Sequence, residues 1–328
     1  MNRRALGRTG ITVSSIGLGC MGMSEFYGPT DEAEAVSALE RALEVGIDFF
    51  DTADMYGPFT NEELLGGFLK GRRDRVVVAT KFGIARSADP AVRGVDNRPE
   101  HIRASCEGSL KRLGIDVIDL FYVHRVDRQV PIEDTVGVLS ELVQAGKVRA
   151  IGLSEVSVAT LRRAHAVHPV AAVQSEYSLF TREPEYDGIL DACRDLGVTF
   201  VAYSPLGRGL LTSAPPTEDN LAPDDFRRRI PRFQGDALEA NLQLAGRVRE
   251  LAAELKATPA QVALAWLLGD PIVVPIPGSR RADRVEENAR AVTLQLSPSS
   301  RTLLNLAFGA NQARGERSSP QGMSLLNG

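Results

Sequence analysis

The sequence predicts an α/β chain that folds as one (β/α)8 barrel, because short apolar runs alternate with amphipathic helical stretches along nearly its whole length. Eight such runs are rich in Val, Ile and Phe and are mostly apolar at consecutive positions, which is typical of parallel strands buried on both faces. The runs are residues 16–19, 47–50, 76–79, 117–123, 148–153, 171–174, 198–202 and 272–275. No linker divides the 328 residues, so we expect a single domain over residues 1–328.

The helical stretches between these runs have recognisable ends. Asp31 is placed to cap the first helix, and Pro99 is placed to open a later one. In four units a glycine stops the helix just before the next strand, and these are Gly46, Gly114, Gly146 and Gly197. Such short helix-to-strand connections are typical of a repeating βα unit.

Two segments fall outside the βα repeat. An insertion at roughly 207–237 carries several prolines and a charged run, which predicts a long loop at one mouth of the barrel. A final helix is expected over residues 298–308. From Gly309 the chain is polar and rich in Gly and Ser, so we expect a loosely held tail over about 309–328.

Composition and charge exclude several classes of protein. Lys and Arg number 38 against 42 Asp and Glu, so the chain lacks the basic excess that nucleic acids and anionic membranes attract. Cys20, Cys106 and Cys193 lie far apart among only four histidines, which argues against a disulfide framework and a metal site. Without a bilayer-length apolar stretch or a signal-like N-terminus, we expect a cytoplasmic protein that binds no membrane. Its oligomeric state cannot be inferred from the sequence.

Residues 17–22 match the nucleotide-binding pattern G-x-G-x-x-G after an apolar run. A dinucleotide-binding crossover needs its helix to begin inside that pattern, so that the helix N-terminus faces the pyrophosphate. Here a loop follows, and the helix begins only near Asp31. We therefore predict a tight loop beside a ligand at residues 17–22, and not a Rossmann fold.

Charged side chains follow three consecutive apolar runs. Asp51, Lys81 and His124 each come directly after such a run, where a lone polar or charged group is costly to bury. The C-terminal ends of barrel strands meet at one mouth, so we expect these groups to converge there beside Tyr56 on the adjoining loop. A nearby ammonium lowers a phenol pKa from its usual ~10. The group therefore predicts a general acid acting on a substrate oxygen.

These residues resemble the aldo-keto reductases, whose Asp, Tyr, Lys and His tetrad corresponds to Asp51, Tyr56, Lys81 and His124. The resemblance covers nearly the whole chain, and its opening is similar to the N-terminal β-hairpin that plugs the bottom of the family's barrel. Residues 17–22, 27–28 and 122–127 are similar to the bacterial and plant branch with pyridoxal reductase-like and perakine reductase-like members.

The resemblance implies that an aldehyde or ketone is reduced to the alcohol, with a hydride from nicotinamide C4 and a proton from Tyr56. It also implies how NADPH is held: Ser154 and Gln174 would bind the carboxamide, and Tyr203 would stack on the ring. The pyrophosphate would lie against Ser204, Pro205, Leu206 and Arg208. The adenosine phosphate would be bound by Gly278, Ser279, Arg280, Arg284, Glu287 and Asn288. Guanidinium groups at a helix start suit a phosphate monoester, which favours NADPH over NADH.

Two positions depart from the family pattern. Glu155 follows Ser154 where many relatives carry Asn, so we do not assign it to the cofactor site. Gly278 stands where some branches carry Lys, which moves the expected phosphate charge onto Arg280 and Arg284.

Substrate contacts are expected from Met23, Tyr27 and Met55 together with Tyr56 and His124, and from loops within residues 82–97 and 207–237. The apolar and aromatic character of these segments suits an aromatic or medium-chain carbonyl compound better than a highly charged sugar phosphate.

Two other functions fit the same residues. An NADPH-sensing regulatory protein with little turnover, like the β subunits of voltage-gated potassium channels, would share the fold and the tetrad. A barrel lyase or isomerase would instead use Lys81 to form a Schiff base. Turnover of aldehydes distinguishes the first alternative, and borohydride trapping of a lysine adduct distinguishes the second.

Overall fold

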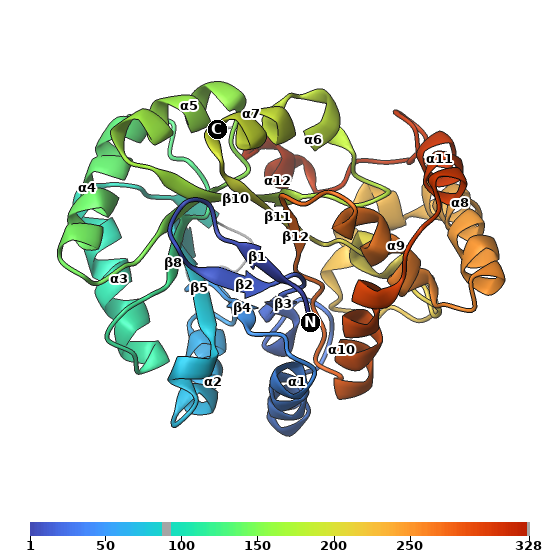
Figure 1. The fold of residues 1–328 in the computed structure, drawn as a ribbon, viewed down its shortest axis with the longest axis horizontal. Coiled ribbons are helices and arrows are strands. Elements are labelled where there is room, and N and C mark those ends of the chain that lie inside the picture. The colour runs from blue at the N-terminus through green and yellow to red at the C-terminus, as the bar shows by residue number, and fades with distance from the viewer. Residues whose placement is uncertain (87–92, 327–328) are drawn as a thin grey trace.

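Figure 1 shows the fold in a computed structural model that describes residues 1–86 and 93–326. Eight strands form a parallel sheet in the order β12-β11-β10-β9-β8-β5-β4-β3. They are β3 (Leu18–Gly19), β4 (Phe49–Asp51), β5 (Val77–Phe82), β8 (Leu120–Val123), β9 (Ile151–Ser154), β10 (Val170–Glu176), β11 (Thr199–Tyr203) and β12 (Val273–Pro275). The Gly17 and Gly19 N–H groups donate to the carbonyls of Pro275 and Pro277, which joins the first strand to the last. The predicted barrel is confirmed.

Each predicted apolar run overlaps one of these strands, but several strands extend further toward their C-terminal ends. Asp51 is therefore the last residue of β4, and Lys81 lies inside β5. Asp51 and Lys81 are therefore held by strand backbone hydrogen bonds, which fix their positions more firmly than a loop would.

The helices lie around the outside of the sheet (Figure 1), except that the last one, α12, lies over one mouth of the barrel. They are α1 (Glu32–Glu44), α2 (Thr60–Leu69), α3 (Pro99–Leu113), α4 (Ile132–Gln144), α5 (Val158–Val167), α6 (Glu183–Tyr186), α7 (Ile189–Leu196), α8 (Gly235–Glu254), α9 (Pro259–Leu268), α10 (Ala282–Ala289), α11 (Pro298–Ala307) and α12 (Pro320–Ser324). The predicted end signals are confirmed: Asp31 accepts a hydrogen bond from the Glu34 N–H. All four predicted stop glycines have positive φ.

The glycines of residues 17–22 allow a close approach of strands rather than a phosphate turn. A Cβ on Gly17 would lie 2.9 Å from the Phe49 carbonyl oxygen, and one on Gly19 would lie 3.0 Å from that of Ile276. The chain then enters a 3-10 helix at Met21–Met23, and α1 begins only at Glu32. The exclusion of a Rossmann crossover is confirmed, but the predicted tight loop at residues 17–22 is wrong, because strand β3 and the 3-10 helix occupy this segment.

The N-terminal hairpin closes the bottom of the barrel. Strands β1 (Arg3–Ala5) and β2 (Thr12–Ser14) pair antiparallel, as predicted. Leu6 and Val13 are fully buried in the cluster of side chains that fills the barrel interior. The Gly7 N–H donates to the hydroxyl of Thr199, the first residue of β11, at 2.8 Å.

The expected mouth loops contain short ordered elements. Residues 207–237 hold three 3-10 helices, Gly207–Gly209, Phe226–Arg229 and Pro231–Phe233, and bury Ile230 and Phe233. Residues 82–97 contain the antiparallel pair β6 (Ile84–Arg86) and β7 (Arg93–Val95), while residues 87–92 of that expected substrate segment lie outside the described residues.

The C-terminal tail was expected to be loosely held, and the structure contradicts this over residues 309–326. The Asn241 side chain bonds the backbone N–H and carbonyl of Arg314, and Arg317 is only 8% exposed. A polar tail docks here because the barrel rim offers buried partners to its polar groups. None of the helices described is long and apolar enough to cross a membrane.

Gly7→Ala tests how tightly the hairpin is seated. Gly7 has φ +57°, and a Cβ there would lie 2.7 Å from the Ala171 carbonyl oxygen at the start of β10. We expect Gly7→Ala to lower the free energy of unfolding by about 1–3 kcal/mol for the clash, in addition to the strain of positive φ. Gly10→Ala is the control, because its φ is +79° and a Cβ there meets nothing within 4 Å. Urea unfolding measures the free energy of unfolding of both variants. An equal loss in Gly7→Ala and Gly10→Ala would mean that the hairpin does not pack tightly against β10.

Candidate active site

Three adjacent strands bring the predicted catalytic groups to one mouth of the barrel. Asp51 ends β4, Lys81 lies near the end of β5, and His124 directly follows β8. These strands are parallel neighbours, so their C-terminal ends lie together. Tyr56 lies on the loop after β4, and its ring packs edge-on to that of His124 at 5.9 Å between centroids. The structure brings all four predicted residues into one cluster.

The Lys81 ammonium is the centre of this cluster. It is fully buried and donates to Asp51 Oδ1 at 2.5 Å, to the Thr52 carbonyl at 2.7 Å and to the Tyr56 hydroxyl at 3.3 Å. An ammonium has three donors, so each is engaged and the group is fixed in place. Burial opposes the charge of Lys81, but Asp51 and Tyr56 together outweigh it, through their charges and hydrogen bonds, and raise the pKa of Lys81 above its usual value.

Asp51 is held from two sides. Its second carboxyl oxygen accepts from Gln174 Nε2 at 2.7 Å, on the non-adjacent strand β10. Burial raises the pKa of Asp51, while Lys81 and Gln174 oppose that rise. With a donor on each oxygen, Asp51 accepts as an ionised carboxylate does. Gln174, predicted only to bind the cofactor, therefore also orients the counter-charge of Lys81.

The pKa of Tyr56 departs from the sequence prediction. Burial raises it above the usual value, and Lys81 limits that rise without reversing it. The expectation of a lowered pKa is wrong in sign here, because the desolvation of a phenol in this pocket outweighs one ammonium at 3.3 Å. Tyr56 is therefore protonated at neutral pH and can donate its proton.

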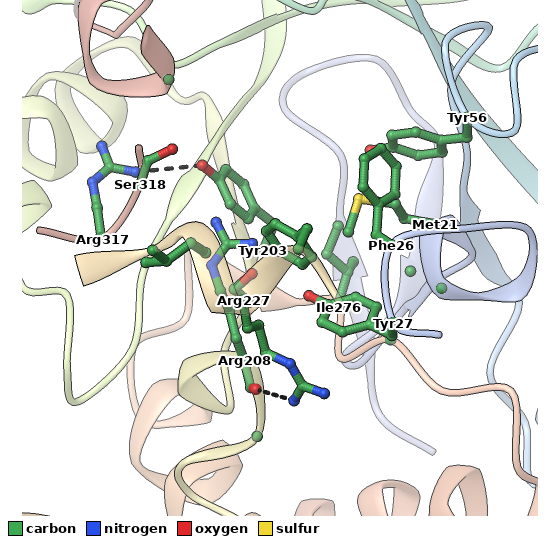
Figure 2. A pocket seen from close by; sticks show the side chains of 18 of the residues that line it. Met21, Phe26, Tyr27, Tyr56, Tyr203, Arg208, Arg227, Ile276, Arg317 and Ser318 are labelled. Carbon is green, nitrogen blue, oxygen red and sulfur yellow. Dashed lines mark hydrogen bonds between the residues drawn. The ribbon is translucent and has the colours of Figure 1, made fainter. Parts of the chain in front are cut away.

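A cavity of about 960 Å³ opens over the cluster and runs across the barrel mouth. Figure 2 shows Tyr56, Phe26 and Met21 on one side of it and Arg317 on the other. Its walls include most of the predicted site residues: Tyr27, Asp51, Met55, Tyr56, His124, Ser154, Gln174, Tyr203, Ser204, Pro205, Leu206, Arg208, Gly278, Ser279 and Arg280. Lys81 lies behind the wall.

Met23 is a correction to the predicted substrate contacts. It is 3% exposed and belongs to the hydrophobic core, whereas Met21 and Gly22 line the cavity. Both methionines belong to the 3-10 helix Met21–Met23. Side chains two residues apart on such a helix point in different directions, so only one of them faces the cavity.

Part of the predicted phosphate site lies outside the cavity wall. Arg284, Glu287 and Asn288 are on α10, where Arg284 pairs with Glu287 at 2.6 Å and Asn288 is buried. Arg281, the next residue of the same loop, also lines the cavity beside Arg280. The predicted loop residues Gly278, Ser279 and Arg280 thus border the cavity, and the predicted helix residues do not.

Glu155 has a structural partner that the sequence did not reveal. It is 3% exposed, has φ +54° and accepts two hydrogen bonds from the Arg317 guanidinium, at 2.9 and 2.8 Å. It also accepts from the Tyr203 hydroxyl at 2.7 Å. Despite burial, these contacts hold the pKa of Glu155 at about 2. The pair ties the tail to the barrel rim and fixes the Tyr203 ring.

A second buried carboxylate extends this arrangement. Glu176, the last residue of β10, pairs with Arg208 at 2.8 Å and with Arg232 at 3.7 Å. Arg208 and Arg232 belong to the insertion, and Arg317 belongs to the tail. Glu155 and Glu176 therefore form a rim charge cluster with Arg208, Arg232 and Arg317, which docks both extra segments onto the barrel.

Comparisons with known proteins find similar sequences and structures. The sequence profile of the family described as Aldo/keto reductase family matches residues 15–305. The thermostable aldo-keto reductase Tm1743, solved in complex with the inhibitor epalrestat, is 32% identical with a TM-score of 0.76, over 94% of this chain and 100% of that chain. The glycerol dehydrogenase AKR11B4 from Gluconobacter oxydans is 28% identical with a TM-score of 0.84, over 93% and 94%. The holo form of aldo-keto reductase AKR11C1 from Bacillus halodurans is 27% identical with a TM-score of 0.73, over 97% and 98%.

Arg317→Met tests the docking of the tail. The change leaves the Glu155 carboxylate buried without its bidentate partner, and removing one member of a buried ion pair costs about 3–5 kcal/mol. We expect the tail to detach so that Glu155 regains water, which hydrogen exchange over residues 313–326 would report as lost protection. Arg314→Met is the control, because it removes an exposed charge from the same tail while the backbone bonds to Asn241 remain. Equal protection in both variants would contradict the role of the pair.

The same pair predicts a pH dependence. The pKa of Glu155 is about 2 in the folded chain and near its usual value when unfolded. Its contribution to stability is therefore present above about pH 4.5 and is lost as the pH falls toward 2. Arg317→Met should flatten this part of the acid-unfolding curve, whereas Arg314→Met should not.

Proposed function

The chain belongs to the aldo/keto reductase family of oxidoreductases, and from this premise we propose that it reduces an aldehyde or ketone to the alcohol with NADPH, using Tyr56 as the proton donor. Enzymes of this family reduce carbonyl compounds with a nicotinamide cofactor. The observation that carries the proposal is the hydrogen-bonded chain from Asp51 through Lys81 to the Tyr56 hydroxyl, at the wall of a large cavity. A phenol placed there can protonate a carbonyl oxygen bound in the cavity.

The residues of the cavity fit a nicotinamide dinucleotide. Ser154 and Gln174 line the cavity and offer the hydroxyl and amide that suit a carboxamide, and Tyr203, on the strand next to that of Gln174, lines the same cavity. Farther along, Arg208 and residues 204–207 offer donors for a pyrophosphate. When bound, the reduced nicotinamide would supply the hydride.

The choice of NADPH rests on three residues that line the cavity, Ser279, Arg280 and Arg281. Within residues 1–86 and 93–326, Arg280 pairs with a single carboxylate, Glu34, at a distance of 3.5 Å. A guanidinium so loosely paired is available to a phosphate monoester, which NADPH carries and NADH does not.

Each residue of the tetrad would then have its own role in the proton transfer. The carbonyl oxygen would lie at the Tyr56 hydroxyl, where His124 can donate a second hydrogen bond. Tyr56 gives up its proton as the oxygen gains charge, and the resulting phenolate lies 3.3 Å from the Lys81 ammonium. Asp51 keeps Lys81 charged throughout, so the stabilising charge is in place before the reaction begins.

The two alternative functions differ in what they require of this site. A Schiff base needs a neutral, accessible amine, but Lys81 is fully buried, engages three acceptors and has a raised pKa. This disfavours the lyase or isomerase. An NADPH sensor would use the same cofactor contacts, and it is distinguished by tight NADPH binding with almost no turnover of aldehydes. The likeness to the pyridoxal and perakine reductase branch stays a prediction.

Tyr56→Phe tests the proton donor. The change removes one hydroxyl from a wall that otherwise stays packed, so we expect kcat for aldehyde reduction to fall by about 10²- to 10⁴-fold. The Kd for NADPH should stay within threefold, which checks that the site is intact. Lys81→Met should cause a loss of similar size, because the phenolate then forms without its counter-ion. Full activity in Tyr56→Phe would exclude the proposed role.

Arg280→Ala tests the phosphate site. Hydrogen bonds to a charged group contribute ~1.5–3 kcal/mol, so the Kd for NADPH should rise by roughly 10- to 150-fold while that for NADH barely changes. Arg284→Ala should raise the Kd for NADPH less than Arg280→Ala does, because Arg284 is already paired with Glu287. Fluorescence titration gives the ratio of the two dissociation constants. A wild-type preference for NADH would contradict the choice of NADPH.

A further inference from the structure

The cavity wall carries many arginines, and most of them form an ion pair with a carboxylate of the chain, although the pair of Arg280 with Glu34 is long at 3.5 Å. The lining arginines are Arg125, Arg208, Arg227, Arg229, Arg280, Arg281 and Arg317. Five of them form an ion pair with a carboxylate: Arg208 with Glu176, Arg227 with Asp225, Arg280 with Glu34, Arg281 with Asp283 and Arg317 with Glu155. Asp51, the carboxylate that lines the same cavity, is paired with Lys81.

Two lining arginines, Arg125 and Arg229, form no ion pair with any carboxylate within residues 1–86 and 93–326. Arg229 is exposed to solvent on the insertion, where water hydrates its charge. Arg125 is partly buried and directly follows His124. Its Nη1 donates to the His124 carbonyl at 2.6 Å and to Ser154 Oγ at 3.1 Å. Both acceptors are neutral. The charge of Glu155 also acts on Arg125, but this carboxylate is already paired with Arg317, so the Arg125 guanidinium has no carboxylate partner of its own among the described residues.

The hydrogen bonds of Arg125 leave much of its donor capacity unused. A guanidinium has five N–H donors in a planar fork, and both bonds of Arg125 come from the same nitrogen. The fork fits a carboxylate, which accepts two parallel hydrogen bonds and supplies the missing charge. In a partly buried cavity such a pair is stronger than on an exposed surface.

Arg125 is also close to the reacting position. Burial sets the raised pKa of Tyr56, and Arg125 is among the charges that oppose that rise. Tyr56 also belongs to an apolar part of the wall, because Met21, Phe26 and Ile84 pack against Met55 and Tyr56. The wall near the phenol thus has an apolar side and a cationic group.

We propose that this site takes carbonyl substrates that carry a carboxylate on a short apolar or aromatic body, and that Arg125 receives the carboxylate as the specificity-determining residue. The inference rests on the proposed carbonyl reduction and names its substrate class. A single carboxylate matches the single unpaired guanidinium in this part of the wall. The apolar side then contacts the body of the substrate, and Tyr56 meets its carbonyl oxygen.

A matched pair of aldehydes tests the proposal: 4-carboxybenzaldehyde and 4-methylbenzaldehyde have similar shape and differ in charge. With NADPH, the wild-type chain should show a lower KM for the carboxylated aldehyde. Arg125→Gln should raise that KM by roughly 10- to 150-fold, with a much smaller effect on the neutral aldehyde. Arg125→Lys keeps the charge but loses the fork, so its KM should fall between these values.

Arg229→Gln is the matched control. It removes an arginine from the same cavity, also without a carboxylate partner in the described part of the chain, but from an exposed position. It should change the KM ratio of the two aldehydes by less than threefold. A loss equal to that of Arg125→Gln would mean that the general positive potential of the cavity attracts the carboxylate, which would overturn the assignment to Arg125.

The remaining outcomes distinguish a failure of this proposal from a failure of the proposed carbonyl reduction on which it rests. If Arg125→Gln lowers kcat for both aldehydes equally, Arg125 assists the reaction itself and the specificity role is overturned, while carbonyl reduction stands. If it weakens NADPH binding and leaves the aldehyde ratio unchanged, Arg125 belongs to the cofactor site and the inference is again overturned. If the wild-type chain reduces neither aldehyde while it binds NADPH tightly, both proposals fail together.

Discussion

The buried ion pair of Lys81 and Asp51 is the constraint on which the candidate site depends. Moving two charges out of water is costly, and the cost is offset only when every donor and acceptor has a partner. Here Thr52, Tyr56 and Gln174 supply those partners. Because they come from the loop after β4 and from the non-adjacent strand β10, the pair ties separate parts of the barrel together. The Lys81 ammonium reaches all of its hydrogen-bond partners only when the barrel has closed correctly. Correct folding therefore also places the Tyr56 hydroxyl and its proton.

The same principle docks the segments that are not part of the barrel. Glu155 and Glu176 sit at the ends of neighbouring strands, and their partners come from the insertion and the tail. An arginine that reaches a buried carboxylate brings its own segment with it, so the rim charge cluster decides where residues 207–237 and 314–326 lie. Those segments then supply much of the cavity wall. Substrate access therefore depends on charges that touch neither the carbonyl nor the phenol.

The sequence predicts what local patterns encode. Strand composition, stop glycines and the placement of Asp51, Lys81 and His124 after apolar runs led to the barrel and its catalytic mouth, because these signals lie within a few residues of what they determine. Other features had no local signal. Glu155 and Arg317 are 162 residues apart, and the local sequence around either residue gives no indication that the two form a pair. Met21 and Met23 lie on the same short 3-10 helix and differ only in the direction of their side chains. The direction of the Tyr56 pKa shift depends on how deeply the phenol is buried, which the composition of the sequence does not give.

A second acid beneath the cluster shows why the field at Tyr56 comes from so few groups. Asp54 is 6% exposed, and burial together with the nearby charge of Glu62 raises its pKa to about 8. Glu62 itself is neutralised by Arg112 at 2.7 Å. At neutral pH Asp54 is therefore protonated and adds no negative charge, which leaves Asp51 as the counter-charge of Lys81.

The raised pKa of Asp54 also affects stability. Because the unfolded chain ionises at this residue first, the folded chain loses stability as the pH rises from about 4 toward 8. The chain thus bears a cost in stability at this position, and the consequence is that the positive field of Lys81 at the phenol is not diminished by a second carboxylate.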